Sequence, residues 1–454
     1  MITVSMPSGV APFGWETSAW KHRDWHPKWD EYRSTAAWQG RMTADVTGAS
    51  ERVTFRSVLR IGEFRTMWLA ELFSVIGDQI ARVALTVLVY DQTSSAALTG
   101  LTYALTFVPA MLGGVLFAGL GDRYPRRDVM IATDVGRAVL VGLMIVPGTP
   151  LWLLCVLVAA MTLLNGPFKA AQQALLPDVL EGKQYMVGMA IRNMTSQAGQ
   201  LVGFAGGGLL VGAASPATGL AVNAGTFVVS ALLLLLVRQR KVAVTGEDKP
   251  SFLASTAAGA RIVWRDPALR TLVALNWLAG FYVVAEALAA PLAGDIGAGA
   301  LAVGLLMAAD PFGSVIGAVV FGRWVPESMQ VRVIGVLGIL AGVPLALVVL
   351  QPGLIAALVL FALSGMLATG YNIQGTVSFV RRLPDRSRAQ CSGLNSTGLI
   401  TVQGLGALAA GALADITGTA NAIAVAGIVG VIVAVPIALS WSKVRGNDPV
   451  AHAS

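Results

Sequence analysis

Several ionisable side chains lie within long apolar stretches of the sequence, and five of them are candidates for proton coupling or substrate binding: Glu71, Asp78, Arg82, Glu286 and Asp310. A charged group near the centre of a lipid-embedded helix costs about 2.5 to 3.5 kcal/mol on insertion scales, so such groups are functional candidates. Asp310 lies about ten residues into its stretch, which at about 1.5 Å per residue is near the membrane midplane. It also precedes Pro311, where a helix is expected to kink. We therefore expect Asp310 to bind a proton or a cationic substrate; the alternative is a carboxylate satisfied by nearby hydroxyls or water.

The first apolar stretch contains three further candidates on nearly one helical face. Asp78 and Arg82 are four residues apart, and Glu71 lies seven residues before Asp78. One interpretation is a structural ion pair between Asp78 and Arg82; the other is a proton-coupled carboxylate whose charged form Arg82 stabilises until substrate intervenes. Glu286 falls toward the outer end of its stretch, where it is either a gate contact or solvent-exposed.

A short basic loop follows the second apolar stretch and contains one carboxylate. Its charged residues are Asp122, Arg123, Arg126 and Arg127. Such a loop can pair with a neighbouring helix end and so latch one conformation, whereas plain membrane topology requires only the cations. Asp134 and Arg137, three residues apart in the next stretch, are expected to brace this loop.

Glycines recur through the fifth apolar stretch at Gly199, Gly203, Gly207 and Gly208. Glycines four residues apart expose the backbone and let two helices touch, which suits an interface that slides or rocks. Ordinary tight packing within a helix bundle is the alternative.

Composition excludes the soluble enzyme classes. Of 454 residues, 55% are apolar and only 13% are charged, whereas soluble proteins carry about 25% charged residues. Mean hydropathy is +0.69. The histidines lie in polar tails, and Cys155 and Cys391 form no repeated ligand spacing, so neither a metal nor another cofactor is expected. The glycine-rich stretch lacks the Lys-Ser/Thr ending of a phosphate-binding loop, so ATP is not expected to drive this protein.

Apolar stretches long enough to cross a bilayer can be counted twelve times from residue 66 onward. We expect them near 66-90, 97-119, 129-147, 151-170, 187-212, 217-237, 269-292, 301-322, 331-350, 353-376, 391-413 and 420-441. The predicted fold class is thus an all-α membrane protein with twelve transmembrane helices in two six-helix bundles. The expected units are a polar, Trp-rich, disordered tail (1–60), two bundles (61–237 and 267–442), a cytoplasmic linker (238–266) and a short tail (443–454).

Lysine and arginine are absent from the six loops expected on the outer side, near residues 91, 148, 214, 296, 351 and 416. Because positive loops stay in the cytoplasm, both termini are predicted to be cytoplasmic. The formal charge of +7 then reflects topology and anionic lipid, and no nucleic-acid partner is expected. An arginine-rich, alanine-rich and glycine-rich composition favours a bacterial cell membrane.

Short patterns recur between the two halves at an offset of about 202 to 205 residues. The matches include Pro109 with Pro311 and Gln200 with Gln403, together with Arg65-Thr66 and Arg270-Thr271. Their common order supports duplication of a six-helix unit, with a central cavity between the halves. Amide and aromatic side chains are expected to line that cavity, among them Tyr103, Phe107, Phe281, Tyr282, Asn165, Asn223, Asn276, Asn372, Gln374, Gln197 and Gln403.

The loop Ala118-Gly-Leu-Gly-Asp-Arg-Tyr-Pro-Arg-Arg127 resembles the signature G-x-L-x-D-R-x-G-R-R of the major facilitator superfamily, with Ala118 and Pro125 in place of its glycines. The stretch from Gly199 to Gly208 resembles the antiporter motif G-x-x-x-G-P-x-x-G-G of exporters, with Phe204 in place of proline. The sequence pattern across residues 60–440 resembles that of the branch of this superfamily that contains enterobactin-type siderophore exporters and macrolide efflux proteins.

This resemblance implies a monomeric twelve-helix transporter with alternating access, which usually exports a small organic molecule in exchange for protons. It implies no enzymatic activity. A proton-coupled nutrient importer shares the fold and the carboxylates, and a non-transporting receptor or scaffold remains a rival from another class.

Overall fold

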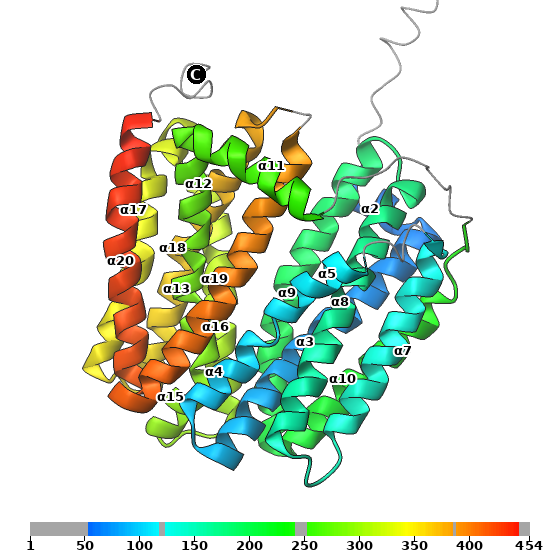
Figure 1. Ribbon diagram of the computed structural model, residues 1–454, viewed down its shortest axis with the longest axis horizontal. Helices are drawn as coiled ribbons and strands as arrows, with labels where there is room; N and C mark the ends of the chain where they lie inside the picture. Colours follow the sequence, from blue (N-terminus) through cyan, green and yellow to red (C-terminus); the bar gives the residue numbers. More distant parts are fainter. Residues whose placement is uncertain (1–52, 118–122, 241–251, 385–386, 445–454) are drawn as a thin grey trace, which may run out of the picture. The chain divides into compact units, whose positions relative to one another are not determined.

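The computed structural model describes residues 53–117, 123–240, 252–384 and 387–444, and within them it contains helices and no strand. The helices of the first half are α2 (Phe55–Leu59), α3 (Gly62–Thr93), α4 (Ala96–Ala104), α5 (Val108–Leu116), α7 (Arg126–Met144), α8 (Leu151–Val179), α9 (Lys183–Ala213) and α10 (Pro216–Leu234) (Figure 1). Helix α2 lies within the segment expected to be a disordered tail, whereas residues 1–52 lie outside the described residues.

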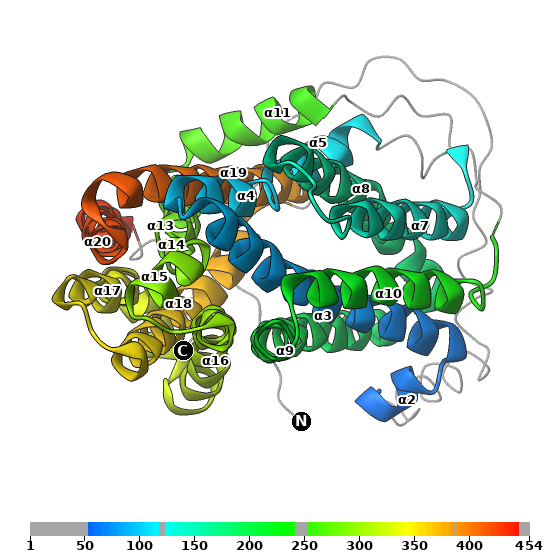
Figure 2. The same ribbon diagram turned by 90° about the horizontal axis from the view of Figure 1, so that it is seen from below.

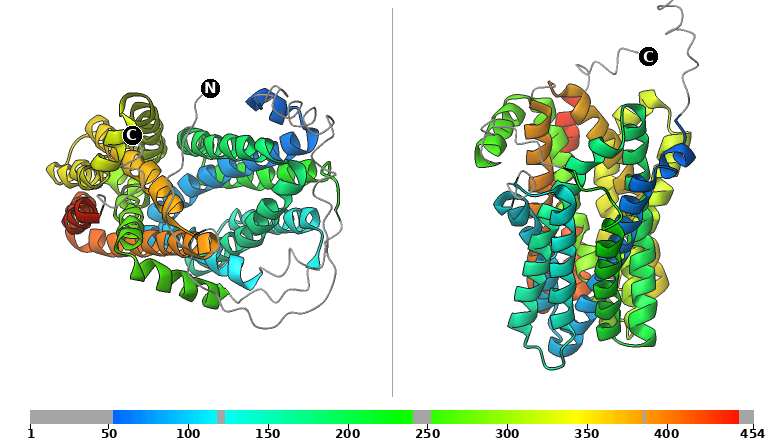
Figure 3. Two further views of the ribbon diagram at one scale, coloured as in Figure 1. Left: turned by 90° about the horizontal axis from the view of Figure 1, so that it is seen from above. Right: turned by 90° about the vertical axis from the view of Figure 1, so that its right-hand side faces the viewer.

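The second half follows α11 (Phe252–Arg265), which lies in the expected linker. Its elements are α12 (Pro267–Trp277), α13 (Ala279–Tyr282), α14 (Val284–Ala287), α15 (Ala289–Asp295), α16 (Ala300–Trp324), α17 (Glu327–Ala346), the 3-10 turn η1 (Leu347–Leu350), α18 (Leu354–Arg382), α19 (Arg388–Thr417) and α20 (Thr419–Val444). Figure 3 shows these helices end-on and from the side.

Each of the twelve predicted stretches coincides with helix in the described part of the chain. Ten helical segments of these residues are long and apolar enough to cross a membrane. Helices α7 and α9 complete the twelve, but α7 carries both Asp134 and Arg137 along its length and α9 is rich in glycine and amides. The predicted all-helical membrane fold is therefore confirmed.

Two of the spans are interrupted along their length. Pro109 has no N–H and cannot continue the helical hydrogen-bond pattern. Between α4 and α5 the chain instead forms hydrogen bonds that span three residues, from Thr106 N–H to the Tyr103 carbonyl and from Phe107 N–H to the Ala104 carbonyl. The seventh span is divided into α12, α13, α14 and α15. Both breaks place side chains in directions that a straight helix would not give.

Within each half, two helices pack closely at a glycine, and the two glycines lie at corresponding positions of the halves. A Cβ on Gly113 of α5 would overlap the backbone carbonyl of Leu163 in α8, and a Cβ on Gly313 of α16 would overlap the backbone carbonyl of Ala362 in α18. These two backbone contacts lie about 200 residues apart in the sequence, which agrees with the duplication inferred from sequence patterns. Only glycine allows two helices to approach this closely.

A buried ionic cluster joins three helices of the first half. The Arg137 guanidinium donates to both oxygens of Asp78 at 3.0 Å and to Asp134 at 3.4 Å, and its side chain is only 2% exposed. The Ser230 hydroxyl donates to Asp134 at 2.6 Å, and the guanidinium lies 4.0 Å from the centre of the Phe227 ring. One arginine thus neutralises two carboxylates within the bundle.

The expected pair between Asp78 and Arg82 is not formed. Both residues lie on α3, but Asp78 points to α7, where one guanidinium nitrogen of Arg137 lies 3.0 Å from each of its two carboxylate oxygens. Asp134 and Arg137 brace α3 and α10; Asp122, which they were expected to support, lies outside the described residues.

Glu71 is neutralised in a similar way. Arg192 of α9 donates to its two oxygens at 2.5 and 2.8 Å, and Lys169 of α8 lies at 3.3 Å. Glu71 is buried, so this carboxylate ties three helices together near the end of the bundle at which α3 begins.

The close contact of α5 with α8 yields a first prediction. We expect Gly113→Ala to lower stability by about 1 to 3 kcal/mol, because its methyl group meets rigid backbone. The adjacent Gly114→Ala is the matched control, since no atom lies within 4 Å of its Cβ position. Thermal unfolding of the detergent-purified protein measures both, and equal midpoints would contradict the contact.

The ionic cluster yields a second prediction. Arg137→Met leaves two carboxylates without a cation inside the bundle, and we expect it to lower the free energy of unfolding by about 3 to 5 kcal/mol. Arg65→Met removes an exposed arginine from α3 and should change stability little. Denaturant unfolding in detergent tests the pair, and similar stability of the two variants would show that the cluster contributes nothing.

Candidate functional site

A cavity of about 300 Å³ lies between the two halves of the described chain. Its first-half lining includes Arg82, Phe107 and Gln200. Its second-half lining includes Tyr282, Glu286, Asp310, Asn372 and Gln403. Three of the five ionisable candidates are thus brought together, one cation and two carboxylates from three separate helices.

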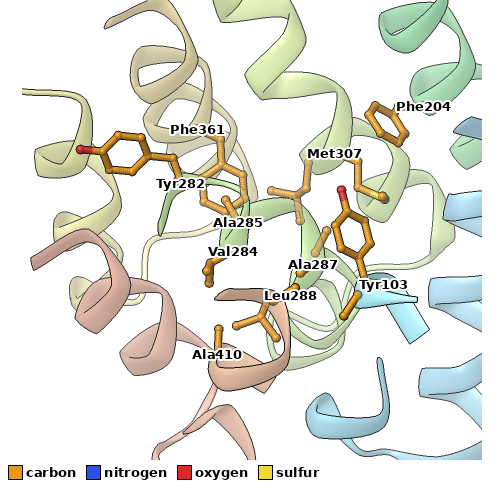
Figure 4. Packing of buried hydrophobic residues seen from close by; sticks show 14 of the residues in the cluster. Tyr103, Phe204, Tyr282, Val284, Ala285, Ala287, Leu288, Met307, Phe361 and Ala410 are labelled. Carbon is orange, nitrogen blue, oxygen red and sulfur yellow. The ribbon is translucent and has the colours of Figure 1, made fainter. Parts of the chain in front are cut away.

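Glu286 enters this cavity because the seventh span is broken around it. It lies on the four-residue helix α14, and the Tyr103 hydroxyl of α4 donates to it at 2.5 Å. This bond joins the two halves. The residues that follow Glu286, Ala287 and Leu288, belong to a buried hydrophobic cluster that also contains Met307 and Tyr103 (Figure 4).

Asp310 lies directly before Pro311 inside α16. Gly365 of α18 makes room for it, since a Cβ there would lie 2.7 Å from the Asp310 Oδ1. The Ser314 hydroxyl, one turn further along, donates to the Gly365 carbonyl at 3.3 Å. Among the described residues, no lysine, arginine or histidine nitrogen lies within 4.0 Å of either Asp310 or Glu286.

Arg82 is the cation of the cavity, and it is held by aromatic rings. Its guanidinium carbon lies 4.8 Å from the centre of the Phe107 ring and 5.9 Å from that of Tyr103. No carboxylate of the described chain lies within 4.0 Å of it. Arg82 therefore faces the same space as Glu286 and Asp310 without neutralising either by direct contact.

Asp78 and Glu71 lie away from this cavity. Asp78 lines a smaller cavity of about 170 Å³ inside the first half, together with Arg137, Asn165 and Lys169. Arg82 lines both cavities, so they meet at its side chain. Of the expected amide and aromatic lining, Phe107, Tyr282, Asn372 and Gln403 reach the central cavity.

Sequence reasoning did not single out Gln200, Ser314 or Thr369, although all three line the central cavity. Ser314 and Thr369 gave no signal, since small hydroxyl residues are common in membrane helices. Gln200 did give one: it matches Gln403 at the offset of the duplication, and both glutamines face the same cavity from opposite halves.

The basic loop after α5 is tied to helix ends of the first half. Arg126 donates to Asp178 at 2.6 Å and to the Ala174 carbonyl at 2.7 Å, both in α8. Arg127 donates to the Val237 carbonyl just after α10 at 3.1 Å. Arg123 is exposed, and Asp122 lies outside the described residues.

The glycines of α9 form two contacts of different kinds. Gly199, Gly203 and Gly207 pack against α3 within the first half. Gly208 instead crosses to the second half, where a Cβ would lie 2.7 Å from the Gly304 Cα.

A matching contact closes the same end of the cavity on its other side. A Cβ on Gly100 of α4 would lie 3.1 Å from the Gly411 Cα of α19. Beside it, the Asp415 carboxylate accepts from the Ser95 hydroxyl at 2.8 Å and from the Ala96 N–H at 2.7 Å. These contacts lie within two turns of the Ser95 end of the helices, hereafter the closed end.

Comparisons with known proteins agree with this architecture. The Major Facilitator Superfamily profile matches the chain twice, over residues 67–290 and 278–453. A relative from Bacillus subtilis (strain 168), an uncharacterized MFS-type transporter named YfiS, is 26% identical over 167 residues, which are 36% of this chain and 40% of that protein. The aligned part therefore spans less than half of this relative.

Solved structures share the fold at low identity. A mutant of the nucleoside transporter NupG has a TM-score of 0.67 at 12% identity and covers 84% of this chain and 99% of its own. A POT family transporter in complex with a thioalcohol-conjugated peptide has a TM-score of 0.66 at 13% identity, with coverages of 84% and 96%. A bacterial homologue of the human lysosomal transporter Spinster, in an inward-facing and unoccupied conformation, has a TM-score of 0.64 at 16% identity, with coverages of 85% and 98%.

Two profile matches that together span most of the chain, a transporter-like helix arrangement and a polar cavity between paired halves point the same way. The chain belongs to the major facilitator superfamily of membrane transporters.

Proposed function

We propose that this protein is a proton-coupled exporter of a small organic compound, such as a drug, a siderophore or a secondary metabolite. The observation that carries the proposal is the pair Glu286 and Asp310, two carboxylates in the cavity between the halves with no cation of the described chain in contact. Elsewhere in the spans, Glu71, Asp78 and Asp134 are each neutralised by arginine or lysine.

Coupling follows from the cost of moving charge through lipid. A carboxylate in this cavity carries its charge past apolar walls only at a large free-energy cost, and protonation removes that cost. Protons and substrate therefore favour opposite states of the transporter, and the exchange drives one against the gradient of the other. Arg82 adds a fixed positive charge to the same cavity.

The proposed orientation places the closed end outside the cell. Loops at that end lack lysine and arginine, while Arg126, Arg323 and Lys443 lie near the opposite end, and positive loops stay in the cytoplasm. Both termini are then cytoplasmic, and the protein functions as a monomer in the bacterial cell membrane. The halves meet closely at this end through the pairs Gly100–Gly411 and Gly208–Gly304, which supports entry of substrate from the cytoplasmic side.

Ethidium accumulation tests this function in cells that express the protein. We expect lower dye than in control cells and a rise when the proton gradient is collapsed. We further expect Asp310→Asn to abolish this gradient-driven efflux, because an amide cannot exchange a proton, while the protein remains folded. Asp295→Asn, at an exposed position of the same half, is the matched control and should transport normally.

The outcomes separate the hypotheses. Unchanged efflux by Asp310→Asn removes Asp310 from the mechanism. Gradient-driven uptake in place of efflux would indicate an importer. The absence of any movement of tested compounds in either direction would favour a receptor or scaffold.

We predict that Glu286 contributes to transport through proton exchange, beyond its hydrogen bond with Tyr103. Glu286→Gln keeps an acceptor for the Tyr103 hydroxyl but loses the titratable group, so we expect at least a tenfold loss of gradient-driven transport with normal expression. Tyr103→Phe keeps the carboxylate and should retain more transport than Glu286→Gln. Efflux rates from dye-loaded proteoliposomes with an imposed pH gradient give both values. The reverse order would show that the hydrogen bond between the halves, and not the proton, is what Glu286 contributes.

A further inference from the structure

Helix α11 differs from the spans in direction and in sequence. It crosses them at the edge of the helix group beside α19 (Figures 1 and 2). Its side toward α19 is held closely: a Cβ on Gly259 would lie 2.6 Å from the Gln390 carbonyl oxygen, and the Cys391 thiol donates to the Gly259 carbonyl at 3.9 Å. Val263, one turn further along, is fully buried.

The opposite face of α11 is exposed and basic. Arg261, Trp264 and Arg265 lie three and four residues apart, which places them on one face of the helix, and all are exposed. Trp264 is 52% exposed although it lies against Trp277, with ring centres 6.3 Å apart. The sequence of α11 contains no acidic residue, and within the described chain no carboxylate lies within 4.0 Å of either guanidinium.

A tryptophan next to two arginines is suited to contact with lipid headgroups. Tryptophan is enriched at the level of the lipid headgroups, where its ring is apolar and its N–H is polar. Arginine binds phosphate through parallel N–H donors. The half-buried Ile262 lies between the packed face and the basic face, so an acyl chain can pass beside it.

We propose that the exposed face of α11, formed by Arg261, Trp264 and Arg265, binds the headgroup of an anionic phospholipid. The lipid phosphate lies between the two guanidinium groups, and the Trp264 ring packs against the glycerol region. Binding fixes α11 at the membrane surface.

The chain continues from α11 into the span that carries Glu286. Only Asp266 separates α11 from α12, where its carboxylate caps the helix by accepting from the N–H groups of Ala268 and Leu269 at 2.8 and 3.4 Å. Arg382 at the end of α18 lies 3.8 Å from the same carboxylate. The span that begins here carries Glu286.

Quenching of tryptophan fluorescence by brominated lipid tests the proposal on the full-length protein in detergent micelles. Because the chain has 11 tryptophans, the Trp264 signal is the difference between the wild type and Trp264→Phe. We expect dibrominated phosphatidylglycerol to quench this signal at lower concentrations than dibrominated phosphatidylcholine. Equal quenching by the two lipids would overturn the proposal.

Arginine variants then identify the contacts. Arg261→Gln and Arg265→Gln should each weaken the apparent affinity for phosphatidylglycerol roughly fivefold, as expected for one cation at an anionic surface. Replacement of both by lysine should retain most of the preference. Arg323→Gln removes an exposed arginine beside the exposed Trp324 on α16 and is the matched control. A loss in Arg323→Gln as large as in the α11 variants would show a general effect of net charge and would overturn the assignment to α11.

Discussion

Charge that enters lipid must be neutralised, and this constraint accounts for the arrangement of the first half. Glu71 is bound by Arg192 and Lys169, while Arg137 serves both Asp78 and Asp134. Apart from the Arg137–Asp134 pair, which lies within α7, these pairings join side chains of different helices, so the contacts that neutralise charge also fix the rotation of α3, α7, α8 and α9. The central cavity departs from this rule: Glu286 and Asp310 have no cation of the described chain within 4.0 Å. The Tyr103 hydroxyl donates to Glu286 in place of a cation.

At its closed end the contact between the halves combines close glycine packing with the bonds of Asp415 to Ser95 and Ala96, and near the cavity it includes the bond from Tyr103 to Glu286. Gly100 contacts Gly411, and Gly208 contacts Gly304. Gly100 corresponds to Gly304 in the duplicated sequence and Gly208 corresponds to Gly411, so the two contacts are equivalent. Glycine contacts have no side chains to interlock, so the halves can separate there without rotamer changes. Asp415, which caps the start of α4, has no counterpart at the second crossing, where Gly212 lies opposite Leu301.

Sequence reasoning reached the fold and part of the site. Apolar length predicted twelve spans, each of which coincides with helix in the described chain, and ten of these helical segments are long and apolar enough to cross a membrane. Depth within its stretch marked Asp310 as a candidate, and the structure places it in the central cavity. Partner choice could not be obtained in this way: Asp78 and Arg82 share a helical face, but the partner of Asp78 lies 59 residues away on α7. Glu286 joins Asp310 only because the seventh span is broken, and no proline marks the interruptions that precede α14. Local spacing predicts which residues share a face, whereas helix rotation and neighbours decide what that face meets.

Helix α7 has a consequence for how the chain enters the membrane. Its buried Asp134 and Arg137 would each oppose partition into lipid by roughly 2.5 to 3.5 kcal/mol if the helix left the translocon alone. Asp78, the carboxylate that Arg137 needs, belongs to α3, which is synthesised first. Ser230, the hydroxyl partner of Asp134, arrives only with α10. Membrane integration of α7 is thus expected to wait for retained neighbours, so this half assembles as a group during synthesis instead of one helix at a time.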